Sequence, residues 1–365
     1  MIEAKRFDQK RSCSTVARMK ITIDSNSGAF AFDCAPSERV LYAGLTRGLA
    51  LPYECATGTC GTCRGRIVEG SAQIEWNEAP GFAKLKRDKG DILMCQARPT
   101  ADCTLRVPAK ISQHANPETL PGHRTGRIGA VRRLVSDVID FDLALSAPMT
   151  FEAGQFVVLE AAGIEGGRAY SMVNFDRATG RLRLVVKQKP GGRFSDWLFG
   201  ADVAGKEVEV FGPLGRATFH PEEDRNVLCI AGGSGLAGMM SILDRAVREG
   251  YFRDRTGHLF FGVRTLADAF YLEELAGYAT AAGGNLQVTL ALSHEPVEGV
   301  AHPQFPGIRL SGGMVHDVAA RGMAGRYENV VAFVAGPPVM VDSALRHLTH
   351  EAKLPRIFVR YDKFA

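Results

Sequence analysis

Four cysteines have the spacing of ligands to an iron–sulfur cluster. Cys55, Cys60 and Cys63 follow the pattern C-x4-C-x2-C, and Cys95 lies well downstream. Cysteines in this pattern hold 2Fe–2S clusters, and thiolates are soft ligands that carry the negative charge ferric ions need. Two glycines inside the loop would let its backbone curl, so that amide N–H groups converge on the sulfurs. The four cysteines are therefore the predicted metal ligands.

Zinc is the main alternative for such a set of thiols, and it is commonly held by paired C-x2-C arms. Only one such arm is present here, because Cys95 stands alone, so the spacing favours the cluster. The remaining cysteines are Cys13, Cys34, Cys103 and Cys229. The last three are expected to be small buried hydrophobic residues, because a secreted disulfide protein would be shorter and more evenly cross-linked. We therefore expect a reducing cytoplasm.

A second group of residues could bind a flavin dinucleotide. The run RAYS at residues 168–171 offers a cation, an aromatic ring and a hydroxyl within four positions. These groups suit a pyrophosphate, an isoalloxazine ring and its reactive nitrogen, although a surface arginine and a packed tyrosine would also explain the run. Gly191 and Gly192 precede Ser195 and a short helix predicted at residues 197–199. Backbone N–H groups at such a helix N-terminus form an anion site.

A third group of residues follows the strand predicted at residues 227–230. Gly233, Gly235 and Gly238 satisfy G-x-G-x-x-G, and a helical pattern begins immediately afterwards. In a strand–turn–helix setting these glycines let a dinucleotide pyrophosphate sit on the helix N-terminus. The alternative is a close-packed glycine turn without a ligand, which the flavin-like residues upstream disfavour. A further turn, AGPP at residues 335–338, follows another apolar strand.

Three blocks of predicted elements must position these groups, since 365 residues exceed one typical core. Residues 19–107 open with a strand hairpin, residues 124–221 are strand-rich, and residues 222–365 alternate strands with helices. The second pattern predicts an antiparallel β-barrel and the third a doubly wound parallel sheet, so the chain is a multidomain α+β and α/β protein. An extension, 1–18, precedes the blocks, and a polar linker, 108–123, separates the first two.

Composition excludes several classes of protein. The formal net charge of +4 is small and spread along the chain, which argues against nucleic-acid binding. No apolar run reaches the length of about 18 residues that a membrane span requires. The N-terminus is polar and basic, without the apolar middle of a secretory signal. These features predict a cytoplasmic protein with no membrane or nucleic-acid partner.

On these motifs, the first block resembles a plant-type ferredoxin, which implies a β-grasp fold. Residues 168–171, 192–195 and 212–215 resemble the RxYS, GxxS and GPxG sites of the ferredoxin-NADP reductase superfamily. The order ferredoxin, flavin domain, nicotinamide domain resembles the reductases of bacterial multicomponent oxygenases. The run WNEAPGF at 76–82 is similar to the same run in toluene monooxygenase reductases. A segment of the third block, at 262–271, is similar to phenol monooxygenase reductases. The run YDKF at 361–364 is similar to the benzoate dioxygenase type.

The resemblance implies roles for individual residues. The implied cofactor-binding residues are Arg168, Tyr170, Ser171, Gly191, Gly192, Ser195, Gly232, Gly233, Gly235, Gly336 and Pro337. Tyr170 and Ser171 would contact the isoalloxazine of FAD, and Ser171, Ala335 and Phe364 would serve hydride transfer, with Phe364 covering the flavin. Ala335 stands where relatives commonly have cysteine, and Gly238 where they commonly have proline. These departures bear on the rate of hydride transfer and not on its existence.

The cofactors together imply a mechanism. NADH yields two electrons as one hydride, a 2Fe–2S cluster accepts one, and a flavin can take two and release them singly. We expect an NADH-dependent oxidoreductase that supplies single electrons to a terminal oxygenase hydroxylase component or to a Rieske-type ferredoxin. Two alternatives remain. One is an electron-transfer subunit of another metabolic redox enzyme, whose cluster would follow the flavin module. The other, suggested by Ala335, is a catalytically poor carrier or regulatory scaffold.

The nucleotide preference depends on the residues after the strand predicted at 258–263. Arg264 could favour the 2′-phosphate of NADPH, but Asp268, Glu273 and Glu274 follow closely. A doubly charged phosphate typically needs two donors, whereas a free ribose prefers an acid. We therefore predict NADH.

Overall fold

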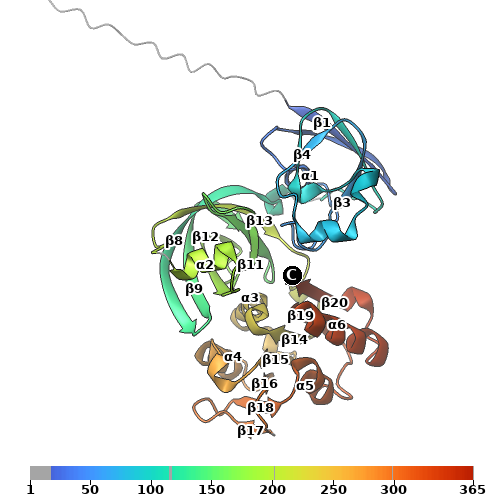
Figure 1. Ribbon diagram of the computed structural model, residues 1–365. Coiled ribbons are helices and arrows are strands. Elements are labelled where there is room, and N and C mark those ends of the chain that lie inside the picture. Colours follow the sequence, from blue (N-terminus) through green and yellow to red (C-terminus); the bar gives the residue numbers. More distant parts are fainter. Residues whose placement is uncertain (1–17, 115–116, 201, 298, 365) are drawn as a thin grey trace, which may run out of the picture.

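The computed structural model describes residues 18–114, 117–200, 202–297 and 299–364. These residues form three units in chain order, coloured from blue through green to red in Figure 1. The predicted extension 1–18, apart from Arg18, and Cys13 within it lie outside the described residues. Within the described ranges, no helix is long and apolar enough to cross a membrane.

The first unit is a mixed sheet crossed by a helix. Its main elements are β1 (Met19–Ser25), β2 (Gly28–Cys34), α1 (Val40–Thr46), β3 (Arg64–Glu69), β5 (Asp91–Leu93) and β7 (Cys103–Val107). The predicted hairpin is β1 and β2, and β1 also pairs in parallel with β7, which gives the order β2-β1-β7-β3-β5. Helix α1 buries almost its whole length against the sheet. This arrangement is the predicted β-grasp fold.

Short elements complete the first unit. They are β4 (Ala72–Ile74), β6 (Ala97–Pro99) and the single turns η1 (Pro80–Lys84), η2 (Arg87–Lys89), η3 (Met94–Gln96) and η4 (Pro117–Thr119). Strands β4 and β6 pair as a separate two-stranded sheet. Between β4 and η1 runs a loop that carries Trp76, and it faces the second unit.

The second unit is an antiparallel sheet curled into the predicted barrel. Its strands are β8 (Gly122–Val135), β9 (Val138–Thr150), β10 (Phe156–Glu160), β11 (Arg168–Ser171), β12 (Ala178–Lys187) and β13 (Glu207–Leu214). They follow the order β11-β10-β13-β8-β9-β12, and a bridge between Met172 and Leu184 links the two edges. Helix α2 (Arg193–Gly200) begins earlier than predicted, because the amide of Asp196 already bonds to the carbonyl of Gly192 at 2.8 Å. Ser195 therefore lies inside the helix and not before it.

The third unit is the predicted doubly wound sheet. Its strands are β14 (Asn226–Gly232), β15 (Gly257–Val263), β16 (Leu286–Leu292), β17 (Val300–Ala301), β18 (Ile308–Gly312), β19 (Val330–Gly336) and β20 (Val359–Lys363). Its helices are α3 (Leu236–Arg248), α4 (Leu272–Ala281), α5 (Val315–Gly322) and α6 (Pro338–Arg346). Its short turns are η5 (Pro221–Glu223), η6 (Gly233–Gly235), η7 (Tyr251–Arg253), η8 (Leu266–Asp268), η9 (His347–Glu351) and η10 (Arg356–Phe358).

The strand order of the third unit indicates where a ligand would bind. The order is β17-β18-β16-β15-β14-β19-β20, with β17 the antiparallel edge. Side chains of α3 and α4 join one core, and those of α5 and α6 join another on the opposite face. The order reverses between β14 and β19, and ligands of such sheets bind beyond the carboxyl ends of the strands at this point. The predicted glycine turns follow these two strands.

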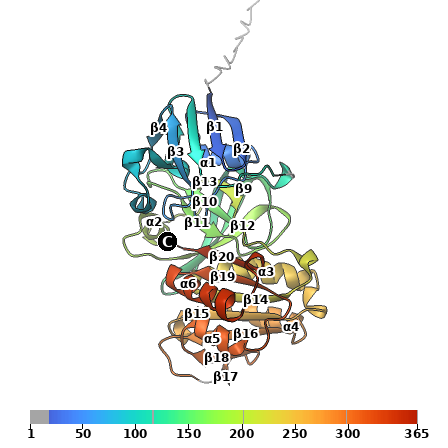
Figure 2. The same ribbon diagram turned by 90° about the vertical axis from the view of Figure 1, so that its right-hand side faces the viewer.

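The three units follow one another from top to bottom of Figure 2, and apolar side chains join them. The core of the first unit includes Phe156, Val158, Phe211 and Leu214 of the barrel. The rings of Tyr42 and Phe211 stack across this boundary, with centroids 3.9 Å apart and planes 7° apart. A second core runs from the barrel into α3, α4 and the sheet of the third unit. The cofactor motifs are therefore held in fixed relative positions.

Candidate functional site

The four predicted ligand cysteines lie together beside the first sheet. Sγ of Cys55 lies 3.2 Å from Sγ of Cys60, and Sγ of Cys63 lies 3.2 Å from Sγ of Cys95. Cys95 reaches the loop because η3 packs against it, and the amide of Met94 donates to the carbonyl of Cys63 at 3.0 Å. Of the four thiols only that of Cys60 is more than slightly exposed.

Backbone N–H groups point at these sulfurs. The amides of Thr57 and Cys60 lie 3.4 Å from Sγ of Cys55, and the amide of Thr62 lies 3.4 Å from Sγ of Cys60. Gly58 adopts φ of 94°, a conformation that only glycine reaches without steric cost. The loop therefore supplies the donors that a negatively charged cluster requires.

The thiols lie where two irons could be held. A hydrogen bond from Cys60 lowers the pKa of Cys55 to about 4. Burial raises the pKa of Cys95 well above its ordinary value, so a thiolate there needs an adjacent cation such as iron. The sulfurs form two pairs, Cys55 with Cys60 and Cys63 with Cys95, as two irons with two thiolate ligands each would require.

The RAYS run forms β11, which pairs with β10 in the barrel. The register sets Arg168 opposite Leu159 and Tyr170 opposite Val157. The ring of Tyr170 lies 5.7 Å from that of Phe194, between centroids, and burial raises the pKa of its hydroxyl. The strand thus carries a cation at its start and a partly buried aromatic ring two residues later, as a flavin site requires.

The hydroxyl of Ser195 holds its own loop together. Ser195 Oγ accepts from the amide of Lys189 at 3.1 Å and lies 3.0 Å from the carbonyl oxygen of Gly192. Gly191 has φ of 75°, and a Cβ on Gly192 would lie 2.8 Å from Ser195 Oγ. Ser195 therefore shapes the glycine turn, and any anion bound there would meet the backbone N–H groups first.

The glycine turns of the third unit pack against each other at the switch point. A Cβ on Gly235 would lie 2.2 Å from the carbonyl oxygen of Ala335, and a Cβ on Gly336 would lie 3.1 Å from the amide of Gly232. Pro337 caps α6 and lies 3.1 Å from where a Cβ on Gly232 would be. These close approaches explain the glycines and leave the N-terminus of α3 open to a ligand beside Gly233.

A chain of contacts links the three residues predicted to serve hydride transfer. A Cβ on Gly238 in α3 would lie 3.8 Å from Oγ of the buried Ser171. Gly235 at the end of η6, one helical turn earlier, meets Ala335 as described above. Strand β20 pairs with β19, and the amide of Phe364 donates to the carbonyl of Gly336 at 3.1 Å. Ser171, Ala335 and Phe364 therefore lie near one another, beyond the carboxyl ends of β19 and β20.

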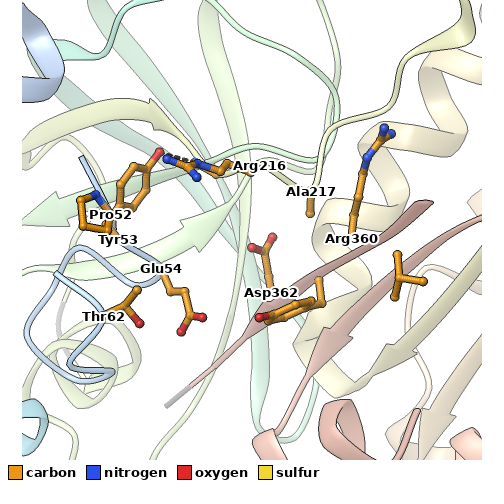
Figure 3. A pocket seen from close by; sticks show the side chains of 11 residues that line it. Pro52, Tyr53, Glu54, Thr62, Arg216, Ala217, Arg360 and Asp362 are labelled. Atoms are coloured by element: carbon orange, nitrogen blue, oxygen red, sulfur yellow. Dashed lines mark hydrogen bonds between the residues drawn. The ribbon is translucent and has the colours of Figure 1, made fainter. Parts of the chain in front are cut away.

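A pocket of about 330 Å³ opens where the three units meet (Figure 3). Tyr53, Glu54 and Thr62 of the cluster loop, Arg216 after β13 and Asp362 of β20 line it. The hydroxyl of Tyr53 accepts from the backbone after β13 at 3.1 Å. Burial and the nearby carboxylate of Glu54 raise the pKa of Asp362 to about 7. Motif analysis did not identify these residues, because no local pattern marks a junction of three distant segments.

Arg264 is already paired with carboxylates. Its Nη2 lies 3.1 Å from Oδ1 of Asp268 and 3.7 Å from Oδ2 of Asp137, which belongs to the β8–β9 turn of the barrel. Asp268 also closes a capping box with Thr265. The guanidinium is thus partly neutralised, which disfavours the binding of a 2′-phosphate.

Comparisons with known proteins agree with the three units. Family models match for a 2Fe-2S iron-sulfur cluster binding domain at residues 23–100, an oxidoreductase FAD-binding domain at 126–219 and an oxidoreductase NAD-binding domain at 229–346. The predicted cofactors, a 2Fe–2S cluster, FAD and NAD(H), and the predicted class of oxidoreductase are thereby confirmed.

Relatives share the whole arrangement. The ferredoxin–NAD(+) reductase component of the alkene monooxygenase system of Xanthobacter autotrophicus is 35% identical over 92% of this chain and 98% of its own length. The reductase component of phenol 2-monooxygenase from Pseudomonas sp. (strain CF600) is 32% identical over 85% of each chain. A solved structure, the ferredoxin reductase in carbazole 1,9a-dioxygenase, superposes with a TM-score of 0.80 and 29% identity over 95% of this chain and 99% of that one. The chain belongs to the three-domain ferredoxin–NAD reductases of the ferredoxin-NADP reductase superfamily.

Proposed function

We propose that this chain is the reductase component of a multicomponent oxygenase. It oxidises NADH and delivers single electrons to a terminal oxygenase hydroxylase component or to a Rieske-type ferredoxin. Support comes from relatives named as reductase components of alkene and phenol monooxygenase systems. The proposed location is a reducing cytoplasm, since Cys34, Cys103 and Cys229 are free thiols.

The observation that carries this proposal is the convergence of three cofactor-binding regions in one chain. The cluster loop, the turn after the last barrel strand and the C-terminal strand line one pocket. Nearby, Ser171 at the end of the RAYS strand contacts the first turn of α3. Electrons could therefore pass from the nucleotide to the cluster within this one chain. A second protein would be needed only to accept electrons from the cluster.

The proposed roles of the residues follow from their positions. Bound FAD would accept a hydride and release its electrons singly. Arg168 and the turn at Gly191 and Gly192 supply positive charge and N–H donors for the flavin pyrophosphate. Tyr170 offers a ring for stacking, and Ser171 a buried hydroxyl beside the nucleotide helix.

The nucleotide and the cluster have their own residues. Gly232, Gly233 and Gly235 admit the NADH pyrophosphate to the start of α3, while Gly336 and Pro337 shape the facing turn. Ala335 and Phe364 border the place where nicotinamide would meet flavin, and Phe364 would exclude water from it. The proposed ligands of the two irons are Cys55, Cys60, Cys63 and Cys95.

The two alternatives make different demands. An electron-transfer subunit of another metabolic enzyme would carry its cluster after the flavin module, whereas here the cluster domain comes first. A poor carrier or scaffold would bind the cofactors but oxidise NADH slowly. Ala335 is the only feature that suggests this alternative.

One experiment separates a working reductase from a poor carrier or scaffold. The purified protein is mixed with NADH under anaerobic conditions, and turnover is followed with ferricyanide, which flavins reduce directly, and with cytochrome c, a one-electron acceptor. We expect both to be reduced, with cytochrome c reduction lost when the cluster is absent. A protein that holds all cofactors yet reduces neither acceptor would be a carrier or scaffold, and the proposal would fail.

A further inference from the structure

A tryptophan of the cluster domain lies against the arginine of the proposed flavin site. The guanidinium carbon of Arg168 lies 5.6 Å from the ring centroid of Trp76. Nη1 of Arg168 donates to the carbonyl of Gly167 at 2.8 Å. Among the residues that the structure describes, no carboxylate forms an ion pair with Arg168, so its charge is available to an anion.

Ion pairs fix this contact from both sides of the domain boundary. Arg39, only 7% exposed, bridges Glu75 of the first unit and Glu160 of β10. Glu75 immediately precedes Trp76. Glu160 lies beside Gly167, since a Cβ there would be 2.9 Å from Glu160 Oε1. The neighbours of Trp76 and of Arg168 are thus joined through one buried arginine.

The backbone around Trp76 is also held in place. The amide of Glu75 donates to the carbonyl of Gln96 at 2.9 Å, and the amide of Ala79 lies 3.3 Å from the carbonyl oxygen of Trp76. Gln96 adjoins the ligand Cys95. Glu75 therefore holds the loop both to the cluster site, through Gln96, and to the barrel, through Arg39.

We propose that Trp76 is a positioning residue for FAD: its indole face holds the guanidinium of Arg168 where the flavin pyrophosphate would bind. The cluster domain then supplies one wall of the flavin site. This inference rests on the proposed role of Arg168. A cation over an indole face is attracted by the ring, most strongly when water is partly excluded, as it is here. Without the indole, Arg168 would sample more rotamers and bind the anion less well.

The test is a double-mutant cycle on flavin affinity. FAD is removed from the full-length protein and titrated back, with dissociation constants read from flavin fluorescence for wild type, Trp76→Leu, Arg168→Leu and the double variant. We expect Trp76→Leu to weaken FAD binding about 3- to 10-fold, the range of a partly buried cation–π contact. It should add no further loss in the Arg168→Leu background, whereas Trp76→Phe, which keeps an aromatic face, should stay within about 2-fold of wild type.

Riboflavin, which lacks both phosphates, separates positioning from general damage. Its affinity should be the same in wild type and Trp76→Leu, and the cluster spectrum should be unchanged. Equal FAD affinity in wild type and Trp76→Leu would overturn the inference, as would an equal loss of FAD and riboflavin binding. If Trp76→Leu does not fold, Trp76→Gln, which also lacks an aromatic face, takes its place in the cycle. An Arg168→Leu variant that binds FAD normally would instead refute the proposed role of Arg168.

Discussion

Cys60 is the most accessible of the four proposed ligand thiols, and Nζ of Lys84 bonds to its carbonyl at 2.9 Å. Cys60→Ala should abolish the cluster, because one iron would keep a single thiolate. FAD should be retained, since the flavin residues Arg168, Tyr170 and Ser171 lie on the barrel, and loss of the Trp76 contact alone is expected to weaken binding only about 3- to 10-fold. Iron analysis and electron paramagnetic resonance of the dithionite-reduced protein measure the first effect, and acid release of FAD measures the second. Cys34→Ala, a buried thiol of β2, is the control and should keep the cluster.

The preference for NADH over NADPH also depends on a few individual residues. We expect kcat/KM for NADH to exceed that for NADPH, because Asp268 and Asp137 share the charge of Arg264. Asp268→Asn should reduce the NADH/NADPH ratio about 3- to 10-fold, corresponding to roughly 1 kcal/mol for a partly exposed pair. Asp176→Asn, which removes one of the two ion-pair partners of Arg248 elsewhere, should leave the ratio unchanged. A wild type that prefers NADPH would contradict this reading of Arg264.

At the scale of elements, the fit of the glycine turns depends on missing side chains. Gly235→Ala would drive a methyl group into the carbonyl of Ala335, at 2.2 Å before relaxation. We expect a loss of about 1–3 kcal/mol in the free energy of unfolding, the usual cost of overpacking, together with slower flavin reduction by NADH. Thermal and denaturant unfolding measure the loss. Gly277→Ala is the matched control, because its Cβ would meet open space on α4; it should stabilise the protein by about 0.4–1 kcal/mol.

Strand β20 carries Asp362 into the pocket, where burial and Glu54 raise its pKa from 3.8 to about 7. Between these two pKa values the folded state binds more protons than the unfolded state, so this group makes stability fall as pH rises. Asp362→Asn removes the effect. Its thermal stability relative to wild type should therefore increase from pH 4 to about 7 and then level off. Melting temperatures across pH 4–8.5 would show this trend, and a difference that stays constant with pH would contradict it.

At the scale of the whole molecule, three cofactor-binding units share continuous cores. The first unit packs onto Phe156 and Phe211 of the barrel, and the barrel packs onto the third unit. The flavin and cluster sites therefore belong to one body, and electrons can pass between them without a collision of two proteins.

This arrangement predicts intramolecular electron transfer. After mixing with excess NADH under anaerobic conditions, the rate of cluster reduction should not change over a tenfold range of protein concentration. Stopped-flow absorbance, which separates flavin from cluster bleaching, measures this rate. A rate proportional to protein concentration would mean that the cluster of one molecule is reduced by the flavin of another.

Local spacing predicted the chemistry of this protein well. The C-x4-C-x2-C loop, the RAYS strand and the glycine turn each place their functional groups within a few residues, and such short segments have few ways to fold. Periodicity likewise predicted the third sheet. It did not predict β9, although Ile139, Phe141 and Leu143 alternate there with polar residues. The tertiary structure adds that Asp140 is fully buried and is held by Arg132 and Arg183 of neighbouring strands.

The sequence by itself determined which cofactors the protein binds and in what order, because each motif is local and the three follow one another along the chain. Only the tertiary structure decided what lies between them. Trp76 beside Arg168 and Asp362 beside Glu54 join residues far apart in the chain. No pattern within either segment specifies such a contact, since it depends on how the cores of separate units pack together. The routes between the cofactors are therefore a property of the assembled fold.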